Sequence, residues 1–593
     1  MLWVIQNPAR FLHERAAIED LAGEQPWIQA LRWGLTKEAM LKVDVDLAIG
    51  DETYDVELLY PNLFPDTPAF VRPRTSTSRW SWHQYGPGGV LCLEWGPDNW
   101  SPQVTGADLL RSAHKLLSTE RGHDAATAVV PSRHKLTFGQ EVRSSTRRVV
   151  LTPAFAAFVR GLPPQAQRGV VTRTIFHNSG VVLFISEILP SNNEALQVSD
   201  LPRGVSSYFP LFPWRGEGWL FRSDALPDTG AVPSAEALVT LVRDAGFADF
   251  TFPSPPEGRT GNTEYLFLLA SRGGALRALT VDTSGEQIVR EYTIADAGDL
   301  DAARLPVDPR PLFEKKVGIV GLGSVGSKVA VSLARSGVRK FLLIDDDVML
   351  RANVCRHELD WTSVGANKVD AVEEALSLVA PGIEVHTRRT RIAGQESPES
   401  ASTALDSLAA CDLLIDATAN PSVFVQLAAI AKRKKKPMIW GEIFAGGIGA
   451  LLARSRPGQD PLPLAMRAGI HRHLHTLPKA PFPNAGDYDV VQDETPLVAF
   501  DAEVSQFAAV LTSFALDTLL DPTPSGFPYS AYLIGFKAGW VFEAPFDVRP
   551  ILVEDLAAET SGPEPLEADH QQAWAALADL ITPPTDVDPG TSR

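Results

Sequence analysis

Residues 316–347, KVGIVGLGSVGSKVAVSLARSGVRKFLLIDDD, carry the strongest fold signal in the C-terminal part of this chain. Residues 316–320 form a short apolar run typical of a strand, and three glycines follow in G-x-G-x-x-G spacing. The apolar periodicity of residues 327–336 predicts a helix that ends at Gly337, and residues 341–344 predict the next strand. This order predicts a βαβ unit whose glycine turn and helix N-terminus suit an anionic phosphate.

The residues after the second strand separate the classes of nucleotide that such a turn could bind. The turn alone fits NAD, FAD or ATP, and a dinucleotide fold needs one acid, here Asp345, for the ribose hydroxyls. Asp347, Asn353, Arg356 and Lys368 follow it. An arginine and a lysine at the phosphates do not help hydride transfer. They do stabilise the charge that builds on the α-phosphate and the leaving pyrophosphate in adenylyl transfer, so the pattern favours ATP over NAD.

The spacing D-x-D-x5-N-x-x-R, followed by G-x-x-K, resembles the ThiF-type adenylation domain of ubiquitin-activating enzymes. It resembles equally their bacterial relatives that activate sulfur-carrier proteins for thiamine and molybdopterin synthesis. The resemblance runs from about Pro311 to Asp521 and includes DLLIDATAN (412–420) and GEIFAGGIGALLARSRPG (441–458). It implies a Rossmann-like adenylation domain, which we place at residues 306–550.

The same resemblance implies roles for individual residues. It implies nucleotide contacts for Gly321, Gly323, Gly326, Asp345, Asp347, Asn353, Arg356, Lys368 and Asp416. The glycines would cradle the nucleotide and Asp345 would bind the ribose. Asn353, Arg356 and Lys368 would contact the phosphates, and Arg356 and Lys368 would also act in catalysis.

Metal binding departs from the family pattern. In the family, the later motif is usually D-x-T-D-N, and its second Asp helps to hold Mg²⁺. This chain has Ala419 at the position of that Asp. We therefore expect a Mg²⁺ ion to depend on Asp347, Asp416 or water. Many sulfur-carrier activators also carry a C-x-x-C zinc knuckle. Leu462 and Ala465 stand where those cysteines would fall, so no structural zinc is expected.

The first 140 residues contain a cysteine in an unusual setting. Cys92 lies in HQYGPGGVLCLEWGPDNWSP (83–102), after the proline-rich path YPNLFPDTPAFVRPR (60–74). These segments resemble the meander, the G-x-x-C-L segment and the W-S-P of ubiquitin-conjugating enzymes, which implies an α+β domain over residues 1–140. On that resemblance Cys92 accepts a modifier as a thioester, because a thiolate is a good nucleophile for acyl exchange.

The H-P-N motif of conjugating enzymes is missing upstream of Cys92. His83 and Gln84 occupy that neighbourhood, and Gln84 could supply the amide donor near a developing oxyanion, with His83 as a supporting residue. The alternative interpretation is that Cys92 is a buried structural thiol. We expect Cys355 and Cys411 to be packing residues, because free cysteine behaves as a small hydrophobe.

The remaining segments carry weaker signals. Residues 141–305 predict an α/β spacer domain, with strands in GVVLFISEI (180–188), GWLFRS (218–223) and EYLFLLASR (264–272) and a helix at 234–245. In the first domain, strands are expected at 41–48 and 53–59 and a helix at 104–117. Residues 551–593 are rich in proline, alanine and acids. They predict a largely disordered tail with one short helix near residues 571–580.

Composition limits the compartment and the partners. A chain of 593 residues predicts about three or four domains, and a net charge of −18 argues against a nucleic-acid partner. Three cysteines cannot form a disulfide framework, and MLWVIQNPARFLHER lacks a signal-peptide layout. No run of about 18 apolar residues suggests a membrane span. We expect an α/β multidomain protein of the cytoplasm.

Together, the two resemblances imply a fused conjugating and activating enzyme, like those of bacterial ubiquitin-like conjugation operons and antiphage defence operons. Its partners would be a small β-grasp modifier and a protein target, and the family implies a homodimer. No cysteine follows Cys411. The acyl group would therefore pass directly to Cys92, which we favour since both units share one chain, or first to Cys355. The alternatives are a sulfur-carrier adenylyltransferase with an inert N-terminal domain and a nucleotide-binding scaffold that has lost catalysis.

Overall fold

In the computed structural model the chain forms two compact units, residues 1–144 and 145–593. The structure describes residues 3–76, 80–81, 83–85, 88–121, 145–177, 180–189, 201–205, 214–228, 232, 234–252, 264–272, 275–282, 287–296, 305–306, 308–394, 397–444, 446–478, 491–492, 495–496, 499–553, 571–574 and 576–577. Among these residues, no helix is both long and apolar enough to cross a bilayer.

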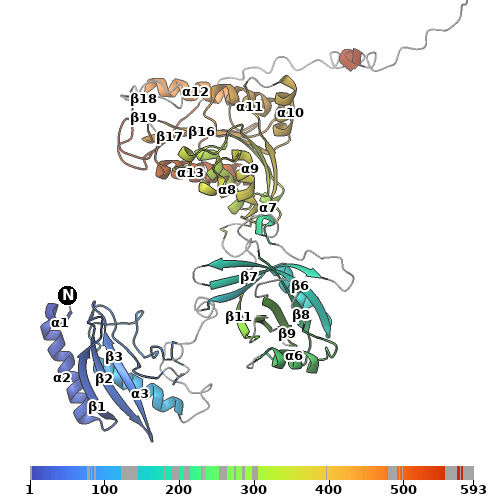
Figure 1. Cartoon of the computed structure of the whole chain (residues 1–593). Helices are drawn as coiled ribbons and strands as arrows, with labels where there is room; N and C mark the ends of the chain where they lie inside the picture. Colours follow the sequence, from blue (N-terminus) through green and yellow to red (C-terminus); the bar gives the residue numbers. More distant parts are fainter. Residues whose placement is uncertain are drawn as a thin grey trace, which may run out of the picture. The chain divides into compact units, whose positions relative to one another are not determined.

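The N-terminal unit is an antiparallel sheet packed with helices (Figure 1). The sheet has the order β1-β2-β3-β4, from β1 (Ile28–Leu35), β2 (Leu41–Ile49), β3 (Glu52–Tyr60) and β4 (Phe70–Pro73). Its helices are α1 (Trp3–Gln6), α2 (Pro8–Glu24) and α3 (Gly106–Arg121). Alternate residues of β2 are buried, which fits a sheet with one face on the core. The strands expected at 41–48 and 53–59 and the helix expected at 104–117 are confirmed.

A buried carboxylate joins the helices and the sheet of this unit. Glu14 on α2 is fully buried, lies 2.7 Å from Arg10 and accepts a hydrogen bond from the Tyr60 hydroxyl at 2.8 Å. It also accepts one from the Gly106 N–H at the start of α3, at 2.7 Å. Because an N-terminal N–H of a helix has no partner within the helix, Glu14 serves as a cap supplied by another element.

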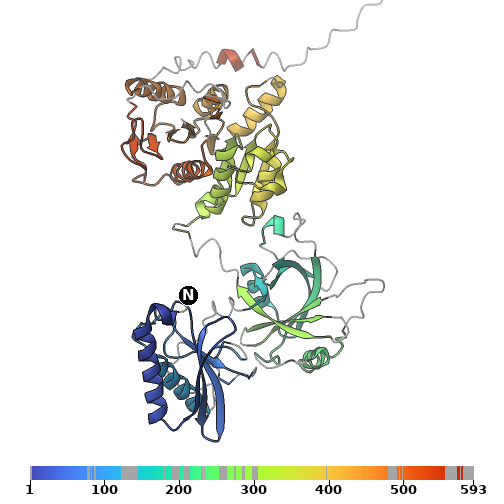
Figure 2. The same ribbon diagram turned by 60° about the vertical axis from the view of Figure 1, so that its left-hand side comes forward.

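The described strands between residues 145 and 296 close into a barrel (Figure 2). Their order around it is β10-β11-β5-β7-β6-β8-β9. Its strands are β5 (Arg147–Leu151), β6 (Ala166–His177), β7 (Gly180–Leu189), β8 (Trp214–Arg222), β9 (Glu264–Ala270), β10 (Leu276–Asp282) and β11 (Val289–Asp296). The helices α5 (Pro153–Gly161) and α6 (Ala235–Asp244) accompany them. The three strands and the helix expected here are confirmed, but the expected α/β class is not, because the described strands close into a barrel instead of forming an open sheet covered by helices. The barrel closes through long-range pairs such as β5 with β11, which no local pattern indicates.

The C-terminal part is an eight-stranded sheet with the order β14-β13-β12-β15-β16-β17-β20-β21. Its strands are β12 (Lys316–Val320), β13 (Lys340–Ile344), β14 (Glu384–Arg388), β15 (Leu413–Asp416), β16 (Met438–Phe444), β17 (Gly449–Ser455), β20 (Ala531–Gly535) and β21 (Val548–Pro550). The first five are parallel and the last three are antiparallel to their neighbours. The predicted βαβ unit is confirmed as β12, α8 (Ser324–Arg335) and β13.

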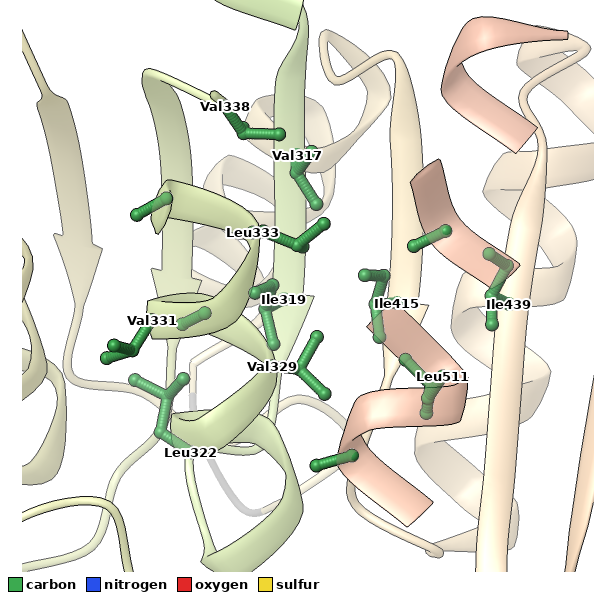
Figure 3. Packing of buried hydrophobic residues seen from close by; sticks show 14 of the residues in the cluster. Val317, Ile319, Leu322, Val329, Val331, Leu333, Val338, Ile415, Ile439 and Leu511 are labelled. Atoms are coloured by element: carbon green, nitrogen blue, oxygen red, sulfur yellow. The ribbon is translucent and has the colours of Figure 1, made fainter. Parts of the chain in front are cut away.

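Helices cover both faces of this sheet. One buried cluster joins the sheet to α8, α9 (Lys368–Ser377) and α13 (Asp501–Leu520), and another joins it to α10 (Pro398–Ala409), α11 (Pro421–Lys434) and α12 (Pro463–Thr476). Figure 3 shows Val329 and Leu333 of α8 against Ile319 of β12. The chain runs from β12 outward to β14, then returns to β15 on the other side of β12. The carboxyl ends of β12 and β15 therefore form a switch point, where ligands of such sheets bind.

Candidate functional site

The glycine turn, residues 321–326, connects β12 to α8 at the switch point. Gly321 has φ +87°, and a Cβ there would lie 2.7 Å from Cγ2 of Thr418. A Cβ at Gly326 would lie 1.9 Å from the Gly321 carbonyl oxygen. Packing within the chain therefore requires these two glycines.

Gly323 is different because a Cβ at this position would meet no atom within 4 Å. The residue is the N-cap of α8, and no side chain of the described residues caps the helix there. The first N–H groups of a helix need a partner from outside the helix, and an anion is well suited to that place. The open space at Gly323 thus fits the close approach of a phosphate, as the sequence pattern predicts.

Asp345 follows β13 and is tied to the glycine turn. Its Oδ2 accepts a hydrogen bond from the Leu322 N–H at 2.6 Å, and its Oδ1 accepts one from the Asp347 N–H at 2.8 Å. The carboxylate therefore fixes both the turn and the start of its own loop. This is the position at which the fold places a ribose-binding acid.

Lys368, at the start of α9, is paired with Asp347. Its ammonium group donates to the Asp347 carboxylate, and its N–H donates to the Asp347 carbonyl at 3.0 Å. Partial burial opposes ionisation of Asp347, but the hydrogen bonds from Lys368 and Val348 outweigh it and lower the pKa of this carboxyl. The Lys368 side chain is 8% exposed, so this cation is held beside the strand end before any ligand arrives.

Asn353 and Arg356 lie on the short segment that follows β13. Asn353 ends the 3₁₀ turn η2 (Arg351–Asn353), and its Oδ1 accepts from the Leu350 N–H at 2.8 Å. The Arg356 N–H donates to the Asn353 carbonyl at 3.1 Å, and the Arg356 residue is half-buried. Asn353 thus shapes the loop that carries the arginine.

His357 is a residue of this site that the sequence reasoning missed. It is buried, its Nε2 lies 2.8 Å from the Leu322 carbonyl oxygen, and its Nδ1 accepts from the Leu359 N–H at 3.2 Å. Nε2 therefore carries the ring proton and donates a hydrogen bond to the Leu322 carbonyl of the glycine turn. Desolvation lowers the pKa of His357, which keeps the ring neutral. The only sequence signal for His357 is its position directly after Arg356, and the spacing of the motif does not indicate a role for that position.

Asp416, the last residue of β15, lies beside Ala419 at the same edge of the sheet. Burial raises the pKa of Asp416 to about 6, although the Thr418 N–H and hydroxyl both donate to its Oδ1, at 3.0 and 2.6 Å. Asp416 and Ala419 line a small pocket together with Glu442, Arg467 and other residues. Within the described part of the chain, no three metal-ligating side chains come together, so the Mg²⁺ site stays a prediction.

Cys92 belongs to the N-terminal unit and is only 5% exposed. Its N–H donates to the His83 carbonyl at 2.7 Å. The carboxamide of Gln84 is used in the same loop: its Oε1 accepts from the Trp80 N–H at 2.8 Å and its Nε2 donates to the Gly89 carbonyl at 3.0 Å. Gln84 therefore shapes the loop before Cys92. To act as the predicted oxyanion donor, Gln84 would have to use the second hydrogen of its Nε2 or give up its bond to the Gly89 carbonyl.

The other two cysteines differ from each other. Cys411 is buried, and burial raises the pKa of its thiol to about 11, so the prediction of a packing residue is confirmed. The same prediction is wrong for Cys355, which is exposed and donates its thiol hydrogen to the Ala352 carbonyl at 3.3 Å. The segment between Asn353 and Arg356 turns outward here, and a packing preference cannot anticipate that geometry.

Residues 306–462 of this part of the chain match the model of the ThiF family. The chain is similar to the ATP-dependent ubiquitin transferase-like protein Cap2 of Enterobacter hormaechei, with 35% identity over 125 residues, 21% of this chain and 20% of that protein. It is also similar to the adenylyltransferase and sulfurtransferase uba4 of Aspergillus niger, with 28% identity over 226 residues, 37% of this chain and 44% of that protein. The chain thus spans less than half the length of these relatives.

Among solved structures, E. coli MccB with ATP shares 19% identity with this chain. The alignment covers 42% of this chain and 67% of that chain, with a TM-score of 0.31.

Proposed function

We propose that this protein uses ATP to adenylate the C-terminal glycine of a small β-grasp, ubiquitin-like modifier and then takes the acyl group onto Cys92 as a thioester. The observation that carries the first step is the uncapped N-terminus of α8 behind Gly323, with Asp345 and Lys368 at the neighbouring strand end. This arrangement offers backbone donors, an acid and a cation to a nucleoside triphosphate. The match of residues 306–462 to the ThiF family supports the same chemistry.

In the adenylation step, a carboxylate oxygen of the modifier attacks the α-phosphorus of ATP, and the bond to pyrophosphate breaks. The α8 N-terminus would hold phosphate oxygens, and Asp345 would orient the ribose. Lys368 would leave Asp347 to stabilise the growing charge on the phosphates, with Arg356 opposing the charge of the leaving group. The ion pair keeps the ammonium group in position at low exposure until the substrate replaces the carboxylate.

In the transfer step, the Cys92 thiolate attacks the acyl carbon and AMP leaves. The resemblance of residues 60–102 to conjugating enzymes supports this role for Cys92. At 5% exposure, the side chains that cover the thiol have to move before an acyl group can reach it. The thioester would then pass to an amine of a target protein, because a thioester remains reactive toward amines.

A second candidate, adenylation of a sulfur-carrier protein, is favoured by the similarity to uba4 and by the low exposure of Cys92. A third, a nucleotide-bound scaffold, rests on Ala419 at the usual metal-ligand position. The first candidate requires Cys92, the second requires only the adenylation site, and the third predicts no modifier-dependent turnover.

One experiment separates the three. The full chain is mixed with ATP, Mg²⁺ and a β-grasp protein encoded beside it, and both ATP–pyrophosphate exchange and a thiol-sensitive adduct are measured. The exposed Cys355 provides the matched control. An adduct that Cys92→Ser abolishes and Cys355→Ser retains supports our proposal. Exchange without an adduct supports the sulfur-carrier candidate, and neither signal supports the scaffold.

A further inference from the structure

Cys92 and His83 lie opposite each other on two paired segments of the N-terminal unit. Gln84 and Leu91 form an antiparallel bridge, and the Cys92 N–H donates to the His83 carbonyl at 2.7 Å. The bridge is an isolated one, and one step along it residues 83 and 92 lie opposite each other, joined by this single backbone bond. Directly opposite residues of an antiparallel pair have side chains on the same face and Cα atoms about 5.5 Å apart. A thiol and an imidazole therefore share one face of this pairing.

A buried carboxylate fixes the imidazole. His83 Nδ1 lies 2.5 Å from Oε1 of Glu120, and the two side chains are 19% and 5% exposed. An ionised carboxylate only accepts hydrogen bonds, so Nδ1 carries the ring proton. In the neutral ring Nε2 is then the proton acceptor. This is the order of groups that prepares a nucleophile: thiol, imidazole and orienting acid.

The helix that carries Glu120 also holds the chain on the other side of Cys92. Ser112, two turns earlier on α3, accepts a hydrogen bond from the Glu94 N–H at 3.0 Å. Leu109 and Leu116 of α3 belong to the buried core of the unit, together with Leu91 and Leu93 on either side of the cysteine. One rigid element thus supports both the cysteine segment and the acid bonded to His83.

From this arrangement we propose that His83 removes the thiol proton of Cys92 and that Glu120 is the positioning residue that sets the tautomer of His83. The inference rests on the proposed function, in which Cys92 is the acyl acceptor, and names the groups that prepare it. The S–H proton moves to His83 Nε2, and Glu120 stabilises the imidazolium. The thiolate then forms the C–S bond as the acyl C–O bond to AMP breaks, and His83 loses its extra proton to solvent.

The test measures the rate at which iodoacetamide alkylates each cysteine of the full chain at neutral pH, with peptides separated by mass spectrometry. Neither ATP nor a modifier is present, so the result does not depend on adenylation. Cys355 is an exposed thiol in the same molecule and serves as the internal reference. Glu120→Gln and His83→Asn remove the proposed groups. Glu94→Gln makes the same charge change at an exposed carboxylate two residues from Cys92.

We expect alkylation of Cys92 to slow by about tenfold or more in Glu120→Gln and His83→Asn, with Cys355 unchanged, because the thiolate is the reactive form. Glu120→Asp keeps a charged acceptor and should recover part of the rate, which a purely structural role would not predict. Equal rates at Cys92 in wild type and Glu120→Gln, including no reaction in either, would overturn the inference. A thioester that forms equally in Glu120→Gln would overturn it too, while leaving the proposed function in place.

Discussion

At the scale of single residues, the glycines of the 321–326 turn have two different roles. Gly326 has no room for a Cβ, which would lie 1.9 Å from a backbone oxygen, whereas Gly323 has open space around it. We therefore predict that Gly326→Ala destabilises the fold by about 1–3 kcal/mol, since overpacking moves the backbone. Gly323→Ala should change stability by no more than about 1 kcal/mol and still weaken ATP binding by about tenfold, because its methyl group enters the phosphate space.

The two glycine variants are compared by denaturant unfolding and by nucleotide titration. A Gly323→Ala protein that binds ATP like wild type would contradict the placement of the phosphates at this turn. Gly382→Ala is the matched control, because a Cβ there also meets nothing and the residue lies away from the turn. Its positive φ of +71° costs some stability, but nucleotide binding should be unchanged.

Asp416 predicts a pH dependence of stability. Its folded pKa is raised by burial from 3.8 to about 6, so the folded state binds the proton more tightly than the unfolded state. The stability that protonation contributes is complete below about pH 4 and is lost as the pH rises through 6. Relative to Asp416→Asn, the wild type should therefore lose about 2–3 kcal/mol between about pH 4 and pH 7.

Urea unfolding of both proteins across this pH range measures the difference. The amide that replaces the carboxyl in Asp416→Asn would keep an acceptor for Thr418, so the comparison isolates the charge. Asp406→Asn, at an exposed carboxyl on α10, is the control and should show a flat difference. A flat difference for Asp416→Asn as well would contradict a protonated Asp416 in the folded protein at low pH.

At the scale of elements, the junction of α2 and α3 rests on one carboxylate. Glu14 is fully buried and bonds Arg10, Tyr60 and the first N–H of α3. Glu14→Ala removes the carboxylate partner of Arg10, which keeps its bonds to the Pro102 and Val104 carbonyls, and it also removes the acceptor of the Tyr60 hydroxyl. It should therefore cost about 3–5 kcal/mol. Glu19→Ala breaks the exposed Arg15–Glu19 pair on the same helix and should cost less than about 1 kcal/mol. Similar costs for the two variants, measured by unfolding, would contradict this account.

The elements that sequence reasoning predicted are those with a local signal. The strand at residues 316–320 and the helix ending before Gly337 follow from apolar periodicity and a glycine, and both are present. The closed barrel depends on parallel pairs between distant strands, such as β8 with β9, and no periodicity encodes them. The roles of His357 and Glu120 depend in the same way on contacts with Leu322 and His83, 35 and 37 residues away.

At the scale of the whole molecule, the division into residues 1–144 and 145–593 predicts more than one unfolding transition. A non-hydrolysable ATP analogue should raise the transition of the second unit only. At about 100 times its Kd it adds about 2.7 kcal/mol to the stability of that unit. Scanning calorimetry with and without the analogue measures this shift, and Gly323→Ala should reduce it. A uniform shift of all transitions would show that the two units unfold together.

The strand order of the C-terminal sheet has a consequence for redesign. Every residue that we assign to the nucleotide follows β12 or β13 or, like Asp416, ends β15, within the parallel half of the sheet. The antiparallel half, β17, β20 and β21, contributes none of them. The loops of that half could therefore be redesigned to bind a different peptide tail without changing the residues that we assign to ATP.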